Sequence, residues 1–546
     1  MTVGAVLAFG LTVLVSRWLQ PRDAGELFEL IALFTILSCS LQLGADTGLT
    51  RWISRARAIG GLAEVRRIVL IAVVPIVAIG VAAVGAVWWA APALARLLLH
   101  SMDPARAVSD IRLIAVFVPL GALSVCLIAA ARGFGRMWPY LGIEGLGKPV
   151  LRIGLVALGV LAGWGLRGAV LGWSIPVAIG VVAGGVILTA LIRKEAPAAV
   201  PVFSGTGRGR LAVEFWRFAA PRGFAGVFQV VVLWLDILLV GALLGSYDAG
   251  VYAAVSRLAM LGTFALEGTR LAIAPQLASL LARRMPSRAA DLYQSATRLL
   301  MLASWPVYIL FAIFPTVALA IFGARYTAGS VSLIIIALAM LVNTGTGNVT
   351  VVLLMGGKSS WNVVNTLIAL SVNIGLNFIL LPRIGIAGAA IAWAASIIVD
   401  NLAAVFEAWV IFGIAPLGRG YGMVVALAGG CFGVIGLAVR VAFGHSAAAA
   451  VLALAIGLVV YGPAVYLSRK RLHLTGLYAA LRPGRAPASP RHTGRHRAPA
   501  RDHSRTGHGG RVTHHGGPRG PAAIQPAARG VARVHPPAAR PARRST

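Results

Sequence analysis

Charge is scarce in this sequence. Only 12% of its 546 residues are Asp, Glu, Lys or Arg, and the mean hydropathy is +0.84. Soluble domains carry about 25% charged residues, so a fold surrounded by water is excluded. Apolar residues make up 58% of the sequence and recur in long runs, which predicts an all-α polytopic membrane protein.

Cysteine is almost absent as well. The three cysteines are Cys39, Cys126 and Cys431, and each lies inside an apolar run. An odd number of cysteines cannot pair completely, and these positions suit small apolar core residues. We therefore expect no disulfide framework.

Enzyme motifs are missing too. Gly357-Lys358-Ser359 resembles the end of a phosphate-binding loop, but Val352 stands where that loop needs glycine. The loops that we place outside the cell are short and hold few carboxylates, which argues against a membrane glycosyltransferase. The seven histidines within residues 482–546 lack the fixed spacing of metal ligands. We expect no enzyme, no cofactor and no metal site.

The positive charge that is present lies mostly in the tail and the loops. The formal net charge is +32, and residues 482–546 hold fourteen arginines against one acid, Asp502. We expect residues 471–546 to form a disordered Arg-, Pro- and His-rich tail that attracts anionic lipid head groups. The remaining basic residues are spread over short loops, which is typical of a membrane protein and not of nucleic-acid binding.

Fourteen apolar runs are candidates for crossing a bilayer, which takes about 20 residues. They cover residues 1–16, 27–45, 68–90, 111–131, 149–163, 168–192, 218–243, 250–275, 297–322, 330–355, 361–382, 388–412, 421–441 and 447–467. Basic residues gather after even-numbered runs, at 51–67, 132–148, 193–210 and 283–288. Cytoplasmic loops carry the excess of Lys and Arg, so this alternation places both termini in the cytoplasm of a cell-membrane protein.

Three short segments occur twice in the same order. Residues 165–173 (GLRGAVLGW) are echoed by 385–393 (GIAGAAIAW), 19–25 (LQPRDAG) by 244–250 (LGSYDAG), and 135–136 (GR) by 357–358 (GK). The offsets lie between 220 and 225 residues. Such echoes predict a duplicated membrane domain, and duplicated membrane domains are typical of transporters whose pathway lies between the halves.

Two stretches carry a family resemblance. SRWLQPRDAGELFEL at 16–30 joins the first two spans, and GGKSSWNVVNTLIALSVNIGLNFILLPRIGIAGAAIAWAASIIVDNL covers 356–402. Together they resemble the polysaccharide-transport branch of the multidrug/oligosaccharidyl-lipid/polysaccharide exporter superfamily, the branch of O-antigen and teichoic-acid flippases. The resemblance covers about residues 1–470 and excludes the tail.

The resemblance implies an architecture and a substrate. It implies two pseudo-symmetric six-helix lobes, at 1–210 and 211–415, followed by two additional transmembrane helices at 416–470. It also implies a glycan linked to a polyprenyl diphosphate, which is turned from the inner to the outer leaflet. Glycosyltransferases or a cell-surface glycan polymerase are then candidate partners.

Several arginines are candidates for holding a diphosphate, because the planar guanidinium stays charged and bonds phosphate bidentately. They are Arg257 and Arg270 in the eighth run, Arg222 near the start of the seventh, and Arg51 and Arg55 at the end of the second. For Arg222 and Arg270 the alternative is that the side chain reaches out to the membrane interface. For Arg51 and Arg55 it is ordinary anchoring by positive charge on the cytoplasmic side.

Carboxylates inside predicted spans are candidates for coupling transport to a cation. Asp236 has no charged neighbour within a helical turn, so its partner must come from another helix, either in a fixed ion pair or in a transport role. Glu267 stands three residues before Arg270 and is placed to pair with it. Asp400 is the third candidate.

Three alternatives to a glycan-lipid flippase stay open. Asp236 is compatible with a cation-coupled multidrug exporter of the same fold, because a lone carboxylate can bind H⁺ or Na⁺. The basic tail allows a non-transporting scaffold that recruits cell-wall enzymes. A membrane glycosyltransferase is the enzyme alternative.

Overall fold

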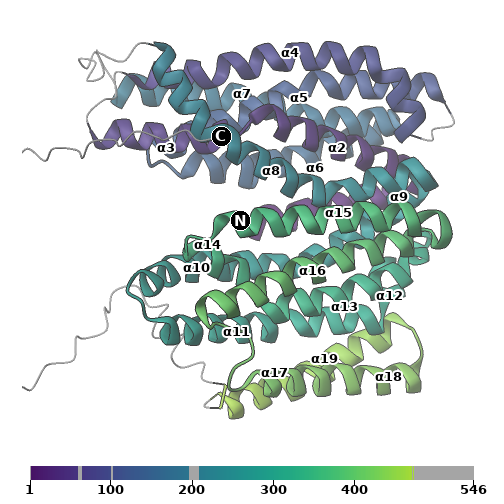
Figure 1. The fold of residues 1–546 in the computed structure, drawn as a ribbon. Helices are drawn as coiled ribbons and strands as arrows, with labels where there is room; N and C mark the ends of the chain where they lie inside the picture. Colours follow the sequence, from purple (N-terminus) through teal and green to yellow (C-terminus); the bar gives the residue numbers. More distant parts are fainter. Residues whose placement is uncertain (1, 60–63, 100–102, 196–207, 470, 473–546) are drawn as a thin grey trace, which may run out of the picture. The chain divides into compact units, whose positions relative to one another are not determined.

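Figure 1 shows the computed structural model of the chain, which describes residues 2–59, 64–99, 103–195, 208–469 and 471–472. These residues form helices and short connections, without a β-strand among them. The described residues belong to one compact unit. The predicted disordered tail at 471–546 falls almost entirely outside the described residues.

The helices of the first half follow one another with short turns. They are α1 (Thr2–Trp18), α2 (Pro21–Gln42), α3 (Ala45–Ala58), α4 (Val65–Leu98), α5 (Pro104–Gly133), the π-helix η2 (Tyr140–Gly147), α6 (Lys148–Leu161) and α7 (Gly165–Glu195).

The second half continues from α8. It contains α8 (Arg208–Leu244), α9 (Ser246–Ala259), η3 (Met260–Gly262), α10 (Thr263–Ala282), α11 (Pro286–Ile313), α12 (Pro315–Ala320), η4 (Ala324–Gly329), α13 (Ser330–Thr346), α14 (Val349–Met355), α15 (Ser359–Ile384) and α16 (Ile386–Phe412). The last helices are α17 (Tyr421–Ala428), η5 (Gly429–Val434), α18 (Ile435–Phe443) and α19 (Ala447–Ser468), which pack against α11.

Twelve helices in the described part of the chain are long and apolar enough to cross a membrane, which makes this a multi-pass membrane protein. The predicted spans at 1–16 and 149–163 coincide with two shorter helices, α1 and α6, of 17 and 14 residues. The count of fourteen spans and the two-lobe boundaries therefore stay predictions.

Burial separates helices that face protein from helices that face lipid. In the most apolar window of α2, 67% of the residues are buried, whereas α4 and α19 have 22% and 17%. These outer helices are nevertheless strongly apolar, so their exposed faces suit the hydrocarbon interior of a bilayer. The α2 helix packs against α5, α8 and α9 and lies where the halves of the chain meet.

The echoed segments adopt matching local structures in both halves. Gly135 and Gly357 have φ of +75° and +77° and follow the C-terminal ends of α5 and α14. In each case the next residue's amide donates back into the last helical turn, as glycine-ended helices commonly do. Gly168 in α7 and Gly388 in α16 each lie against the backbone of the preceding helix. The duplication read from the sequence therefore extends to backbone geometry.

Candidate functional site

A cavity of about 280 Å³ lies between helices of the two halves. Its walls come from α1, α2, α6 and α7 of the first half and from α8 and α9 of the second. Most of the lining is apolar, with two threonines, two tryptophans and two arginines as its polar members. The lining residues are Ala8, Leu11, Thr12, Val15, Leu27, Phe28, Ile31, Phe34, Thr35, Arg152, Val156, Trp173, Trp234 and Arg257.

The first-half arginine of this cavity is Arg152 on α6. Its guanidinium carbon lies 4.0 Å from the centre of the Trp173 ring, and its Nε donates to the Trp173 carbonyl oxygen at 3.1 Å. Trp173 on α7 is itself held edge-on against Phe34 of α2, with ring centres 4.9 Å apart. The stacking and the hydrogen bond fix the guanidinium at the cavity wall.

The second-half arginine is Arg257 on α9, and it is held in the same way. Its guanidinium carbon lies 4.6 Å from the centre of the Trp234 ring of α8. Its Nη1 lies 3.7 Å from the sulfur of Met260, and its Nε is buried without a hydrogen-bond partner among the described residues. A buried N–H donor without an acceptor is costly, so this guanidinium is available for a ligand.

Electrostatically, the cavity is cationic. Arg152 and Arg257 are the charged residues among its described lining, and no carboxylate accompanies them. Each guanidinium offers planar N–H donors that match the oxygens of phosphate. The arrangement can therefore hold an anion between the two halves of the chain.

The structure distributes the five predicted arginines over four places. Arg257 lines the cavity, whereas Arg51 of α3 and Arg222 of α8 stack on one ring, Phe218, each with its guanidinium carbon 3.9 Å from the ring centre. Arg55 lies 5.3 Å from the ring centre of its neighbour Trp52. Arg270 donates to Glu267 at 3.0 Å, the pairing expected from their spacing, and both side chains are about half exposed.

Asp236 lies in a buried polar cluster formed by α8, α9 and α15. Its carboxylate accepts hydrogen bonds from the Tyr252 hydroxyl at 3.1 Å and from the Asn377 amide at 2.8 Å. Asn377 also donates to the side-chain oxygen of Asn373 at 3.2 Å. The partners do come from other helices, as expected, but they are neutral, and Asp236 has no ion pair among the described residues.

Asp400 on α16 does not join Asp236. One of its carboxylate oxygens is buried without a hydrogen-bond partner in the described structure. Glu407, two turns further along α16, accepts from the Asn365 amide at 2.9 Å. No group of three or more His, Cys, Asp or Glu side chains suited to a metal ion occurs within the described ranges.

Sequence reasoning missed Arg152 and the ion pair that precedes it. The buried Lys148 forms a salt bridge with the partly exposed Glu144 and donates to the Ser124 hydroxyl at 2.8 Å. Glu144, Lys148 and Arg152 are spaced four residues apart, the spacing of neighbours on one helix face. The apolar run at 149–163 starts after Lys148, which the count of loop charges assigns to the preceding loop. A start of this short span nearer Tyr140, the alternative that the sequence leaves open, includes both Glu144 and Lys148. In the structure, η2 and α6 make one helical segment from Tyr140 to Leu161.

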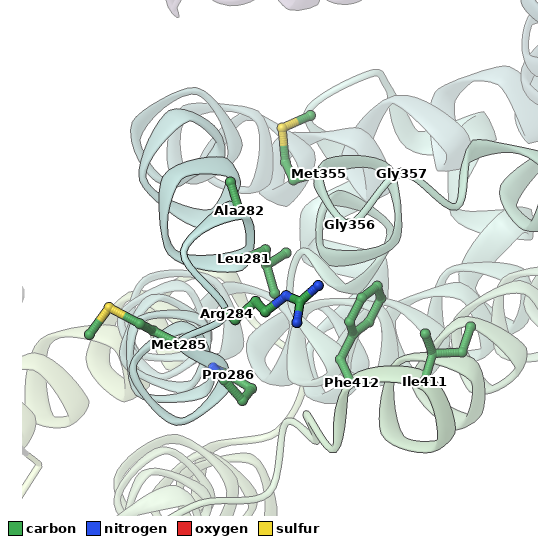
Figure 2. Close-up of a pocket in the computed structure, with 10 residues that line it drawn as sticks. All are labelled: Leu281, Ala282, Arg284, Met285, Pro286, Met355, Gly356, Gly357, Ile411 and Phe412. Atoms are coloured by element: carbon green, nitrogen blue, oxygen red, sulfur yellow. The ribbon is translucent and has the colours of Figure 1, made fainter. Parts of the chain in front are cut away.

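A further pocket, of about 520 Å³, lies where α10, α14 and α16 end. Figure 2 shows the Arg284 guanidinium extending toward Phe412 in this pocket. Helix C-termini carry negative partial charge, so the arginine balances three helix ends and an added anion is not favoured. Gly357 belongs to the turn after α14, so the Gly357-Lys358-Ser359 segment is a helix-end turn and not a phosphate loop.

Comparisons with known proteins identify the family and the fold. Residues 1–280, slightly more than half of the chain, match the model of a family described as polysaccharide biosynthesis protein. A search of curated proteins finds no match.

Solved structures share the fold at low sequence identity. A lipid II flippase, MurJ, in an inward closed conformation is 13% identical, with a TM-score of 0.65 over 86% of this chain and 97% of that one. An inward-facing multidrug resistance MATE family transporter of the MOP superfamily is 14% identical, with a TM-score of 0.63 over 76% and 95%. A MOP superfamily transporter from Pyrococcus furiosus, described by the reverse polarity of its binding pocket, is 14% identical, with a TM-score of 0.54 over 75% and 93%. The chain belongs to the polysaccharide biosynthesis protein family and has the fold of MOP-superfamily transporters.

Proposed function

We propose that this protein is a secondary transporter that flips a polyprenyl-diphosphate-linked oligosaccharide from the inner to the outer leaflet of the cell membrane. The product would serve cell-surface polysaccharide assembly. The observation that carries the proposal is the cavity between the two halves, with Arg152 on one side, Arg257 on the other and no carboxylate in its described lining.

The charge of the cavity favours a diphosphate over an organic cation. Two guanidiniums match the two phosphates of a diphosphate, each with bidentate donors. A multidrug exporter for cations needs acidic groups at its binding site. The candidate carboxylate, Asp236, does not line this cavity and accepts hydrogen bonds from Tyr252 and Asn377. The drug-exporter alternative is therefore the weaker one.

The places where the halves touch support a proposal of alternating access. Near the start of α3, the backbone of Gly44 lies against that of Ala219 and Gly223 on α8. At the other end of α2, its first turns pack against the start of α9. We propose that these two contacts open in turn as the lobes 1–210 and 211–415 rock, with both termini in the cytoplasm.

Arg51 and Arg222 contribute at the first of these contacts. Both stack on Phe218, so two positive charges, one from each half, lie close together at the end of α2. An arriving diphosphate would neutralise both. We assign Arg55 and Arg270 a supporting role in attracting anionic head groups.

We further propose that the Asp236 cluster couples the cycle to a cation. A buried carboxylate surrounded by amides and a hydroxyl, with no ion pair in the described structure, suits an exchangeable proton or Na⁺. Glu267 already has Arg270 as a partner, and Asp400 remains a secondary candidate. The basic tail is proposed to attach to anionic lipid heads, with glycan polymerase or glycosyltransferases as partners.

Reconstitution in liposomes tests the proposal. Fluorescent polyprenyl-diphosphate oligosaccharide would be placed in both leaflets, and a membrane-impermeant quencher would report lipid that reaches the outer leaflet. We expect translocation by the protein above protein-free vesicles and no efflux of a cationic dye. Dye efflux without lipid translocation would favour the drug exporter. A chain ending at Leu481 should retain translocation, whereas a scaffold would depend on the tail.

A further inference from the structure

A third cavity, of about 390 Å³, lies between α4 and the first turns of α8. It is lined by Glu64, Arg67, Leu70, Ile71, Val74, Pro75, Leu211, Ala212 and Trp216. It shares no lining residue with the two-arginine cavity. Charged groups occupy one end, and the rest of the wall is aliphatic or aromatic.

Glu64 is the unusual member of this lining. It is only 2% exposed, and its Oε2 has no hydrogen-bond partner within the described structure. It stands at the N-cap of α4 but makes no capping hydrogen bond with its side chain. A buried carboxylate without a partner is strongly disfavoured. No described residue satisfies this oxygen, and Glu64 lines the cavity, so a ligand in the cavity is placed to do so.

Arg67 lies one helical turn further along α4, with its side chain exposed and no salt bridge to Glu64 or to another described acid. By the rise of an α-helix the two residues are about 4.5 Å apart along the axis. Beyond Arg67, the lining residues of α4 are apolar, and this helix is among the twelve candidate membrane spans. From the end of α4 toward its middle, the cavity thus offers a carboxylate, a guanidinium and an apolar wall.

We propose that this cavity binds a phosphoethanolamine phospholipid. The ammonium would donate to Glu64, the phosphate would accept from Arg67, and the acyl chains would lie along Leu70, Ile71 and Val74. Trp216 supplies an indole of the kind that is enriched at the level of lipid head groups. The order of charges along α4 is the order of groups in the lipid, since a short ester link separates ammonium from phosphate.

Charge complementarity selects this lipid among common ones. An anionic head group without an amine leaves Glu64 unsatisfied. A trimethylated choline head carries the positive charge but has no N–H to donate. A lipophilic cation satisfies Glu64 and leaves Arg67 without a partner. The inference does not depend on the proposed transport function, because it concerns different residues.

Native mass spectrometry of the full-length protein, with lipids added back after delipidation, tests the site. The probes are phosphatidylethanolamine, phosphatidylcholine, phosphatidylglycerol and tetraphenylphosphonium. A hydrogen bond to a charged group corresponds to about tenfold or more in affinity, so we expect phosphatidylethanolamine to bind about tenfold more tightly than phosphatidylcholine. Glu64→Gln should remove most of that difference. Arg67→Gln should weaken the binding of both lipids and leave the difference in place, because both lipids carry the phosphate. The matched control is Arg66→Gln, because Arg66 is exposed and does not line the cavity.

Three results would overturn the proposal. The first is equal binding of ethanolamine and choline lipids, and the second is a preference for phosphatidylglycerol. The third is that Glu64→Gln abolishes the binding of tetraphenylphosphonium but leaves the binding of phosphatidylethanolamine unchanged. If Glu64→Gln does not fold, crosslinking of a photoactivatable phosphatidylethanolamine to the wild-type protein tests the site instead. Labelling within residues 64–75 or 211–216 supports the site, and labelling only elsewhere contradicts it.

Discussion

Gly25 and Gly250 occupy the same position in the two copies of the repeated turn, 225 residues apart, and they lie against each other. A Cβ on Gly25 would lie 1.7 Å from the Ser246 carbonyl oxygen, and one on Gly250 would lie 2.3 Å from the Pro21 carbonyl oxygen. Pro21 and Ser246 are also equivalent in the repeat. The contact is therefore self-complementary, as in an interface about a two-fold axis.

This contact predicts that neither glycine accepts a side chain. Gly25→Ala should lower stability by about 1–3 kcal/mol, the usual cost of overpacking, because backbone and not a flexible side chain blocks the new methyl group. Thermal unfolding in detergent measures the effect. Gly226→Ala in α8 is the control, since a Cβ there meets nothing within 4 Å, and it should leave the melting temperature equal or higher. Equal melting temperatures for Gly25→Ala and the wild type would contradict the close contact.

The Lys148–Glu144 pair predicts strongly non-additive substitutions. Lys148→Met leaves the Glu144 carboxylate without its partner and should cost about 2 kcal/mol or more. Adding Glu144→Gln should recover much of that loss, because no unpaired charge then remains. Stability measured for both single variants and the double variant gives the coupling energy. Additive losses would mean that the salt bridge does not operate in the membrane domain.

Phe218 predicts a coupling between the two halves. Its ring contacts the guanidiniums of both Arg51 and Arg222, and each cation–π contact contributes about 0.5–1 kcal/mol. Phe218→Leu should therefore destabilise the wild-type protein more than it destabilises the Arg51→Gln, Arg222→Gln background. Melting temperatures of the four proteins complete the cycle. An identical shift in both backgrounds would show that the arginines do not use the ring.

Asp236 predicts a variant that folds but loses its response to cations. Asp236→Asn keeps the size of the side chain and an oxygen for the Tyr252 hydroxyl, so folding should be retained. If an exchangeable cation balances the carboxylate, translocation by the wild type should respond to a Na⁺ or proton gradient, and translocation by the variant should not.

Glu267→Gln serves as the comparison for this experiment, because Glu267 is already paired with Arg270 and its variant should keep the wild-type response. The coupling role of Asp236 is wrong if Asp236→Asn follows the gradient as the wild type does.

Much of the membrane fold was predictable, because it is determined by local pattern. The apolar runs mark the helices, and the echo of 19–25 in 244–250 anticipates the matching geometry at Gly25 and Gly250. Glu267 and Arg270 pair as their spacing predicts. Such features depend on a few neighbouring residues, so one sequence is enough to read them.

The cavity was only half predictable. Arg257 is conspicuous within an apolar run, whereas Arg152 was not singled out, although it lies in the predicted fifth span. What makes Arg152 a cavity residue is Trp173, 21 positions later on another helix. The same holds for Arg51 and Arg222, which meet at Phe218. Contacts between distant helices depend on packing, and no periodicity in a single sequence encodes them.

The most direct test of the account is the rate at which cavity variants translocate the fluorescent polyprenyl-diphosphate oligosaccharide in liposomes. The variants are Arg152→Gln and Arg257→Gln, with Arg283→Gln as the control, because Arg283 is an exposed residue of the turn after α10. Loss of one charge-assisted contact corresponds to about tenfold or more. We predict at least that fall for both cavity variants and none for the control. Wild-type rates in both cavity variants would contradict the claim that these two arginines hold the diphosphate.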